Sequence, residues 1–200
     1  TEWDAREGGP PADFREIKNQ AISAQRKGEA GTYKINNMMQ KVLNPNPKYR
    51  IDLMRPKWLE KLPVRAGIGD KVVCIENTYD LRDYFDRFES FADDGVTPEP
   101  GSYIQCPENK QMLNGEVGII AEIHPDGGLE IDFGDRIVEL PAAYEDMNTH
   151  TSRLYTVYPQ MRLELAYALT THKCQGSEFD TVIYLLNARN TYMQNRKNYY

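Results

Sequence analysis

The stretch LAYALTTHKCQGSEFDTVIYLL, residues 165–186, contains two apolar runs separated by a polar segment. Its second run, residues 181–186, is a nearly continuous series of apolar and β-branched side chains, which is typical of a strand covered on both faces. The pattern predicts a strand, a loop with a helix, and a second strand in a parallel α/β sheet. Ligands bind at the carboxyl ends of the strands in such sheets. The polar side chains after the first run are therefore candidate binding residues: Thr170, Thr171, His172, Lys173, Gln175, Gly176, Ser177 and Glu178.

Residues 168–180, ALTTHKCQGSEFD, resemble motif V of superfamily 1 helicases, in particular that of the RecD-like branch. The resemblance implies that four residues contact the phosphates of single-stranded DNA: Thr170, Thr171, His172 and Lys173. It implies that three more contact ATP: Gln175, Gly176 and Glu178. In this family, the carboxylate at the position of Glu178 accepts hydrogen bonds from the ribose hydroxyls.

Two observations temper this interpretation. Cys174 stands where the family pattern would have a small residue such as Ser or Ala. In addition, a polar connection that turns at Gly176 would be ordinary in any α/β domain, because glycine tolerates a positive φ. The helicase interpretation is favoured because other segments of the family occur in the right order on both sides.

The upstream segment repeats the order of strand, basic loop and helix. Residues 21–24 are a short apolar strand, residues 25–31 (QRKGEAG) are a loop bounded by glycine, and residues 33–43 have apolar side chains at helical spacing. The helix is predicted to end at Asn44-Pro45. This segment resembles the motif IV region, in which a basic residue faces the triphosphate. Either Arg26 or Lys27 could have that role, and a solvated basic loop is the alternative.

The middle of the chain has a different period. Short strands are predicted at residues 70–75, 118–123, 129–133 and 137–140, with glycine-containing turns between them. They predict a small antiparallel β-barrel, and the family has an SH3-like insertion at this position. Residues 79–112 are an extra insertion, whose aromatic side chains at helical spacing predict an amphipathic helix. A helix that caps the barrel is favoured over an element that docks a partner or splits strands.

Charge is unevenly distributed along the chain, whose net charge is −6. Residues 1–60 have 11 basic and 8 acidic side chains, residues 61–150 have 7 and 19, and residues 151–200 have 6 and 3. The three segments therefore carry +3, −12 and +3. Phosphate contacts are expected on the basic flanks, because the acidic middle segment repels DNA.

Composition also predicts the compartment. No apolar run is long enough to span a membrane, and the first residues lack the order of a signal peptide, so a cytoplasmic protein without a membrane partner is expected. The three cysteines lie far apart without a CxxC pair. Reduced thiols and no metal site are therefore predicted.

The predicted fold class is α/β, a RecA-like parallel-sheet half-domain of the P-loop NTPase type but without the P-loop, interrupted by a small antiparallel SH3-like β-barrel. Residues 1–13 would be a linker, and residues 14–64 the first part of the second RecA-like domain. The barrel insertion would be residues 65–145. Residues 146–200 would complete the RecA-like domain, ending before motif VI.

The resemblance implies the C-terminal part of an ATP-dependent DNA helicase that couples ATP hydrolysis to translocation on single-stranded DNA and to duplex unwinding. ATP and Mg²⁺ would be bound mainly by a first, N-terminal RecA-like domain, which would be a partner together with single-stranded DNA and other protein subunits. One alternative is a vestigial helicase domain that only binds single strands or proteins. Another is a protein-docking module built on the barrel and the aromatic helix.

The isolated chain is predicted to hydrolyse no ATP above background, because it contains no GxxxxGK[ST] loop to hold the phosphates. Phosphate release measured in the presence of single-stranded DNA checks this expectation. Clear, DNA-stimulated turnover by the purified 200-residue chain would contradict it.

Overall fold

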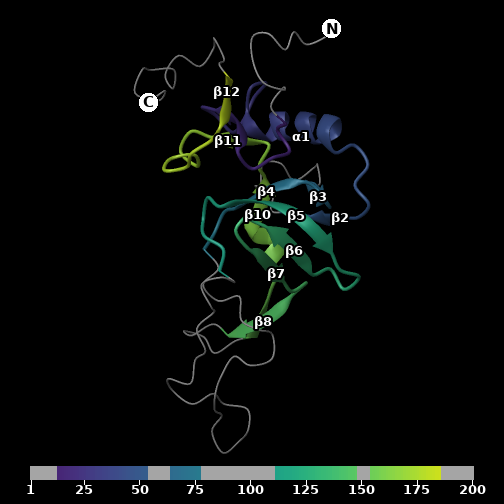
Figure 1. The fold of residues 1–200 in the computed structure, drawn as a ribbon. Helices are drawn as coiled ribbons and strands as arrows, with labels where there is room; N and C mark the ends of the chain where they lie inside the picture. Colours follow the sequence, from purple (N-terminus) through teal and green to yellow (C-terminus); the bar gives the residue numbers. More distant parts are fainter. Residues whose placement is uncertain (1–12, 54–63, 78–110, 148–153, 186–200) are drawn as a thin grey trace, which may run out of the picture. The chain divides into compact units, whose positions relative to one another are not determined.

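The computed structural model describes residues 13–53, 64–77, 111–147 and 154–185 (Figure 1). The chain folds into two compact units, one made of residues 1–45 and 167–200 and the other of residues 46–166. The second unit is therefore an insertion between the helix and the later strands of the first. In the described residues, no helix is long and apolar enough to cross a membrane.

The first unit contains a parallel sheet of three strands in the order β11-β1-β12. The central strand β1 (Asn19–Ser23) is completely buried and pairs with β11 (Ala168–Thr170) and β12 (Thr181–Leu185). Its buried side chains include the apolar Ala21 and Ile22 and the polar Asn19, Gln20 and Ser23. The predicted α/β class with a parallel sheet is confirmed.

Helix α1 (Thr32–Leu43) follows β1 and packs against β11. It ends at Asn44, and Pro45 follows, as predicted from the restriction that proline imposes on the preceding residue. Asn36 is the buried polar residue in the middle of this helix. Its side-chain amide donates to the carbonyl oxygen of Ala168 at 3.0 Å and accepts from the amide of the same residue at 2.7 Å. This pair of bonds fixes the helix to the outer edge of β11.

Two expectations for the stretch from 165 to 186 were wrong. Residues 171–176 form consecutive turns, and no helix occurs in the described connection of residues 171–180. The turns close locally, for example from the Lys173 amide to the Thr170 carbonyl at 2.9 Å, and Gly176 has a φ of +83° that interrupts a right-handed helix. Strand β12 is also not covered on both faces, since Val182 and Ile183 are 46% and 47% exposed. It lies at an edge of the three-stranded sheet.

The second unit contains an antiparallel sheet of five strands in the order β10-β4-β5-β6-β7. Its buried face is formed by fully buried apolar side chains, including Val73, Ile120, Ile131, Val138 and Leu163. The tight turns contain Gly127 and Gly134, both with positive φ, as the turn residues predicted. The strands are β4 (Lys71–Cys74), β5 (Val117–Ile123), β6 (Leu129–Asp132), β7 (Ile137–Leu140) and β10 (Leu163–Leu165).

Strand β10 was not expected in this sheet. Leu165, which begins the stretch of residues 165–186, belongs to this strand: it pairs antiparallel with Val72, and Leu163 pairs with Cys74. The alternation of Leu163, Glu164 and Leu165 suits a strand with one buried face, which an antiparallel sheet provides. The SH3-like character of this sheet stays a prediction.

The described part of the second unit contains two further antiparallel strand pairs. Strand β2 (Arg50–Asp52) pairs with β3 (Arg65–Gly67), and β8 (Tyr144–Met147) pairs with β9 (Leu154–Val157). The 3₁₀ helix η3 (Pro159–Arg162) precedes β10. Strands β2 and β9 therefore lie in the second unit, whereas the predicted boundaries assign residues 14–64 and 146–200 to the RecA-like part. The helix predicted within residues 79–112 and most of the linker 1–13 lie outside the described residues.

Asn36→Ala should lower the free energy of unfolding by about 2–6 kcal/mol, because it leaves the buried amide and carbonyl groups of Ala168 without the Asn36 side chain as partner, at about 1–3 kcal/mol each. The urea midpoint measured by circular dichroism reports the loss. Asn37→Ala, one position along the same helix, is the matched control and should change stability by less than about 0.5 kcal/mol. Equal effects of the two substitutions would show that the Asn36 bonds do not stabilise the unit.

Candidate functional site

The two predicted binding loops leave the parallel sheet at the same edge. Ser23, the last residue of β1, is the register partner of Thr170 in β11 and of Leu185 in β12. Because all three strands are parallel, the loop after Ser23 and the loop after Thr170 both begin at the carboxyl ends of the strands. The amide of Thr171 donates to the carbonyl of Ser23 at 3.2 Å, which joins the two loops at their start. The sheet therefore brings together the segments that contain all the predicted site residues.

A second contact holds the start of the motif V segment against the sheet. The hydroxyl oxygens of Thr171 and Tyr184 lie 3.1 Å apart, in hydrogen-bonding distance. Tyr184 belongs to β12, on the other side of β1 from β11. Thr171 is half-buried, so one predicted DNA-contacting hydroxyl is already bonded within the unit. Its remaining hydrogen-bonding capacity is what a phosphate could use.

Ser23 also shapes the basic loop of residues 24–31. Its hydroxyl donates to the carbonyl of Ala30 at 2.5 Å and accepts from the amide of Gln25 at 3.2 Å. These bonds fold the loop back over the end of β1. Gly31 permits the return, since a Cβ atom at this residue would lie 2.5 Å from the backbone carbonyl of Lys27. Gly28 supplies the positive φ that the turn needs, +87°.

Carbonyl groups of the same loop accept hydrogen bonds from the first amides of helix α1. The amides of Thr32 and Tyr33, in the first turn, donate to the carbonyls of Gln25 at 3.0 Å and of Arg26 at 3.4 Å. Free amides at a helix start usually bind anions. Since two of these donors already have acceptors, a phosphate at this edge would depend mainly on side chains.

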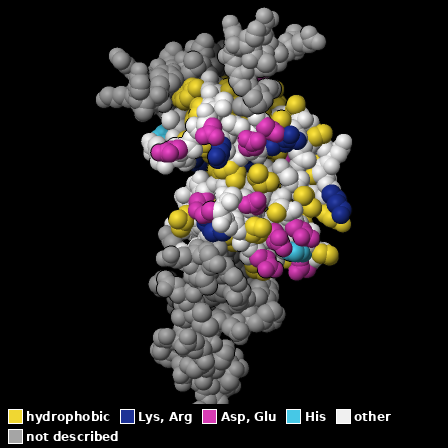
Figure 2. All heavy atoms as spheres, in the orientation of Figure 1, with side chains coloured by type: hydrophobic (Ala, Val, Ile, Leu, Met, Phe, Trp, Pro, Cys, Tyr) yellow, Lys and Arg dark blue, Asp and Glu magenta, His cyan; other side chains and the backbone are white. Residues whose placement is uncertain are grey.

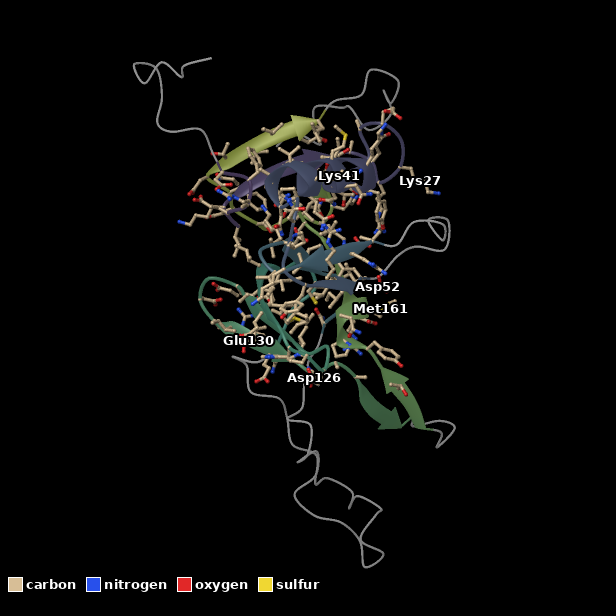
Figure 3. The ribbon with its side chains drawn as sticks, turned by 90° about the vertical axis from the view of Figure 1, so that its right-hand side faces the viewer. Lys27, Lys41, Asp52, Asp126, Glu130 and Met161 are labelled. Carbon is tan, nitrogen blue, oxygen red and sulfur yellow. The ribbon has the colours of Figure 1, made fainter. Side chains whose placement is uncertain are left out.

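Arg26 and Lys27 are both exposed, but they are held differently. The Arg26 guanidinium donates to the Tyr33 hydroxyl at 2.6 Å and lies 5.2 Å from the centroid of the Tyr33 ring. Figure 3 shows Lys27 projecting outward from the loop. Lys34, on the first turn of α1, is paired with Glu29. The structure keeps both candidates for the phosphate contact at the loop surface, with Arg26 preoriented by Tyr33.

The motif V segment presents its side chains in two groups separated by a turn. His172 is exposed and Lys173 half-buried before the turn, whereas Gln175 and Glu178 are exposed at and after it. At Gly176, no atom lies within 4 Å of the position that a Cβ would occupy, so the turn is open to solvent. Within the described part of the chain, the Glu178 carboxylate has no hydrogen bond or ion pair. It is therefore available to a ligand.

Sequence patterns did not identify the residues that position these loops. Ser23, Asn36 and Tyr184 make hydrogen bonds that connect elements more than 10 residues apart or fold a loop, and apolar periodicity does not report such bonds. One signal was present for Asn36. It is a polar residue on the face of α1 that faces β11, where an apolar side chain would be expected.

Cys174 and Cys74 are both free thiols. Cys174 lies in the motif V turns and is half-buried. Cys74 lies on β4 in the second unit, where burial raises the pKa of its thiol. A buried thiol with a raised pKa is a poor nucleophile, so Cys74 has a packing role.

No family model matches the sequence. The chain is 26% identical over 189 residues to the ATP-dependent RecD2 DNA helicase of Deinococcus radiodurans. The RecD-like superfamily 1 resemblance is confirmed. The match covers 94% of this chain but 18% of the relative, so the chain spans less than a fifth of the length of that protein.

Solved structures that are similar to this chain include three of Pif1. Bacteroides Pif1 bound to single-stranded DNA has a TM-score of 0.45 at 16% identity, over 83% of this chain and 34% of that one. Bacteroides Pif1 in complex with ADP-AlF4 has a TM-score of 0.44 at 14% identity, over 90% and 37%. Pif1 from Candida albicans has a TM-score of 0.41 at 13% identity, over 88% and 42%.

Gly31→Ala should lower the free energy of unfolding by about 2–3 kcal/mol, because its methyl group meets backbone atoms of Arg26 and Lys27 that cannot move without opening the loop. Gly28→Ala is the control. It adds the strain of a positive φ, about 1 kcal/mol, but its new Cβ would meet only the Gln25 side chain, at 3.5 Å. Urea titration of both variants measures the difference. A Gly31→Ala variant as stable as the parent would show that the loop is not folded back on itself.

Proposed function

We propose that this chain is part of the second RecA-like domain of an ATP-dependent DNA helicase, which couples ATP hydrolysis to translocation on single-stranded DNA and to duplex unwinding. The observation that carries the proposal is the register of Ser23 with Thr170, which places the basic loop and the motif V segment at one edge of the sheet. The similarity to RecD2, which is named as an ATP-dependent DNA helicase, supports it.

In this proposal, Thr170, Thr171, His172 and Lys173 bind the phosphates of the single strand. Hydroxyl, imidazole and ammonium groups donate to phosphate oxygens and do not require particular bases, which suits a protein that moves along DNA. His172 is exposed, and Thr170 is half-buried at the end of β11, where its side chain can still be reached by solvent. Contacts of this type lose affinity as salt is added, because phosphate binding releases counterions.

The nucleotide would be bound by the basic loop and by the second half of the motif V segment. Arg26 or Lys27 would contact the phosphates, and Gln175, Gly176 and Glu178 would approach the nucleoside, with the exposed Glu178 carboxylate on the ribose hydroxyls. ATP and its Mg²⁺ would be held mainly by the N-terminal RecA-like domain, which is the proposed partner across the cleft. The chemistry would be positioning and charge stabilisation on the transferring phosphate.

Coupling between the two ligands would follow from the shortness of the segment that binds them. Lys173 and Glu178 are separated by the open turn at Gly176, and the segment is anchored at Thr171 and at Asp180. The Asp180 amide donates to the Lys18 carbonyl at 2.8 Å. A change at the nucleotide would therefore be transmitted to the DNA contacts through a few residues fixed at both ends.

A vestigial domain that only binds single strands or docks proteins is not favoured, because the sequence similarity is to an ATP-dependent helicase along nearly the whole chain. We further propose a cytoplasmic location and, as partners, other subunits of a DNA-processing assembly.

Glu178→Ala and Lys173→Ala should have separable effects in the full-length protein. Loss of the Glu178 carboxylate removes a charge-assisted hydrogen bond of about 1.5–3 kcal/mol, which corresponds to roughly ten- to a hundredfold weaker ATP binding. Loss of Lys173 should weaken single-strand binding and reduce its salt dependence by about one phosphate contact, with ATP affinity unchanged in the absence of DNA. Fluorescent nucleotide titration and DNA anisotropy at several salt concentrations measure the two effects.

Asp180→Ala and Lys18→Ala are the matched controls. Both residues are exposed, their ion pair is loose at 3.9 Å, and both lie at the opposite, amino-terminal side of β12 and β1. They should change neither affinity by more than about twofold, since an exposed pair contributes less than about 1 kcal/mol. If Glu178→Ala and Lys173→Ala both lost nucleotide and DNA affinity together with thermal stability, the segment would be a structural junction and the assignment would be wrong.

A further inference from the structure

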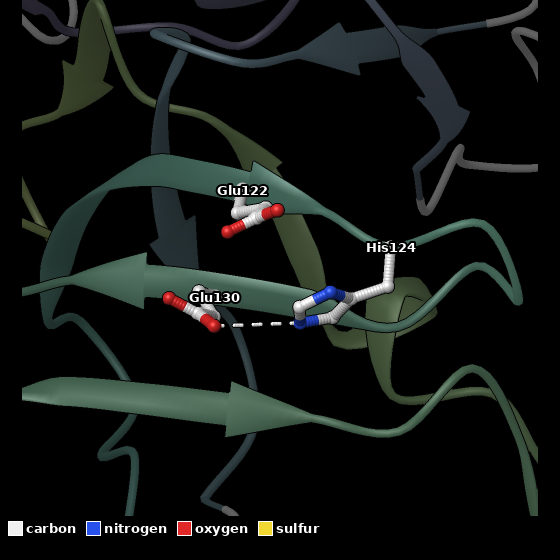
Figure 4. Close-up of side chains that lie close together, drawn as sticks. All are labelled: Glu122, His124 and Glu130. Atoms are coloured by element: carbon white, nitrogen blue, oxygen red, sulfur yellow. Dashed lines mark ion pairs between the residues drawn. The ribbon is translucent and has the colours of Figure 1, made fainter.

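A cluster of three potential metal ligands lies on the β5–β6 hairpin of the second unit, whereas the residues of the proposed helicase site belong to the first unit. Glu122, His124 and Glu130 each offer one ligand atom, and these atoms lie within 4.8 Å of one another. Figure 4 shows the His124 ring directed toward Glu130, with Glu122 on the adjacent strand. No other group of this kind occurs among the described residues that were compared.

The backbone of the hairpin explains why these side chains converge. Glu122 and Glu130 are direct cross-strand partners, and the register of the two strands shifts between Ile120 and Glu122. This bulge places Glu122 on the outer face, since Ile123 beside it is buried. His124 follows two residues later and therefore points to the same face as Glu122. Its amide donates to the Gly128 carbonyl at 2.8 Å, which closes the turn.

The charge on this face is unfavourable without a cation. In the strand register, Glu130 lies directly opposite Glu122 of β5 on one side and Glu139 of β7 on the other. Three glutamates therefore form a row across three strands. Like charges directly opposite each other destabilise a sheet. Figure 2 shows acidic side chains gathered around a histidine on this part of the surface. A bound cation would relieve this repulsion.

His124 gives an independent indication of a ligand. Its side chain is 30% exposed, and its Nε2 atom, which is itself buried and makes no hydrogen bond, lies 3.4 Å from Oε1 of Glu130, close enough for an ion pair when the imidazole is protonated. A bound ion or water would complete the bonding of such a buried nitrogen. The nitrogen faces into the cluster, where a metal ion bound to Glu130 would be.

We propose that Glu122, His124 and Glu130 form a binding site for a first-row transition metal dication of the Zn²⁺ type. Two metal bonds of about 2.1 Å at a tetrahedral angle separate their ligand atoms by about 3.4 Å, the distance found between His124 and Glu130. One imidazole and two carboxylates suit such an ion, whereas Mg²⁺ and Ca²⁺ prefer oxygen ligands alone.

The bound ion would cross-link the end of β5 to the start of β6 and neutralise the glutamate row. Three protein ligands leave at least one coordination position for water or for a group of another molecule. This site does not depend on the proposed helicase function. It differs from the expectation that the chain has no metal site, because that expectation considered only cysteine-based patterns.

Isothermal titration of the purified chain with ZnCl₂ tests the proposal. One ion should bind per chain, and Glu122→Gln, Glu130→Gln and His124→Gln should each weaken binding by about tenfold or more, as loss of even an outer-shell partner can. Zn²⁺ should raise the melting temperature of the parent and much less that of these variants, because a ligand stabilises only the state that binds it. A tenfold excess of Mg²⁺ should not compete.

Glu139→Gln is the matched control, since it removes one charge from the same row but lies outside the ligand cluster. It should keep the parent affinity within about threefold. Equal weakening by Glu139→Gln and Glu130→Gln would indicate general attraction to acidic side chains, and full affinity in His124→Gln would place the ion elsewhere. Co²⁺ substitution gives a further criterion. An absorption band from thiolate to Co²⁺ would show binding at Cys174 and overturn the proposal.

Discussion

The parallel pairing of β1 with both of its neighbours is the constraint on which the first unit depends. Only five residues form this strand, yet it is completely buried and donates and accepts along both edges. A shift of one residue in the register of β1 would turn Gln20 and Ile22 together to the other face of the sheet and would move Ser23 away from Thr170. The convergence of the basic loop and the motif V segment therefore follows from a register, and the register follows from which side chains can be buried.

Much of the fold could be predicted from periodicity. The strand before the basic loop, the helix that ends at Asn44, and the strands with turns at Gly127 and Gly134 were all confirmed within a few residues. These segments are long enough, or bounded by glycine and proline strongly enough, for local sequence to decide their structure. The candidate site could be predicted as two segments, but their residues' roles rest on the resemblance alone.

The errors have a common physical origin. Periodicity indicates which side chains are buried but not which element buries them. The pattern of residues 163–165 therefore does not distinguish a segment that precedes the motif V strand from a strand of the antiparallel sheet, which these residues join. The missing helix after Thr170 reflects a short connection, in which turns around Gly176 reach the next strand without one. The Glu122, His124 and Glu130 cluster depends on a bulge and a cross-strand pair, neither of which sequence spacing reveals.

Asn36 has a consequence for solubility as well as for packing. Strand β11 lies at an edge of its sheet, and an exposed strand edge is a template on which other chains can add. The side-chain amide of Asn36 occupies both backbone hydrogen-bonding groups of Ala168, the first residue of this three-residue strand. An incoming strand would have to displace the whole helix to pair there, so a single amide protects the chain from intermolecular sheet extension at this edge.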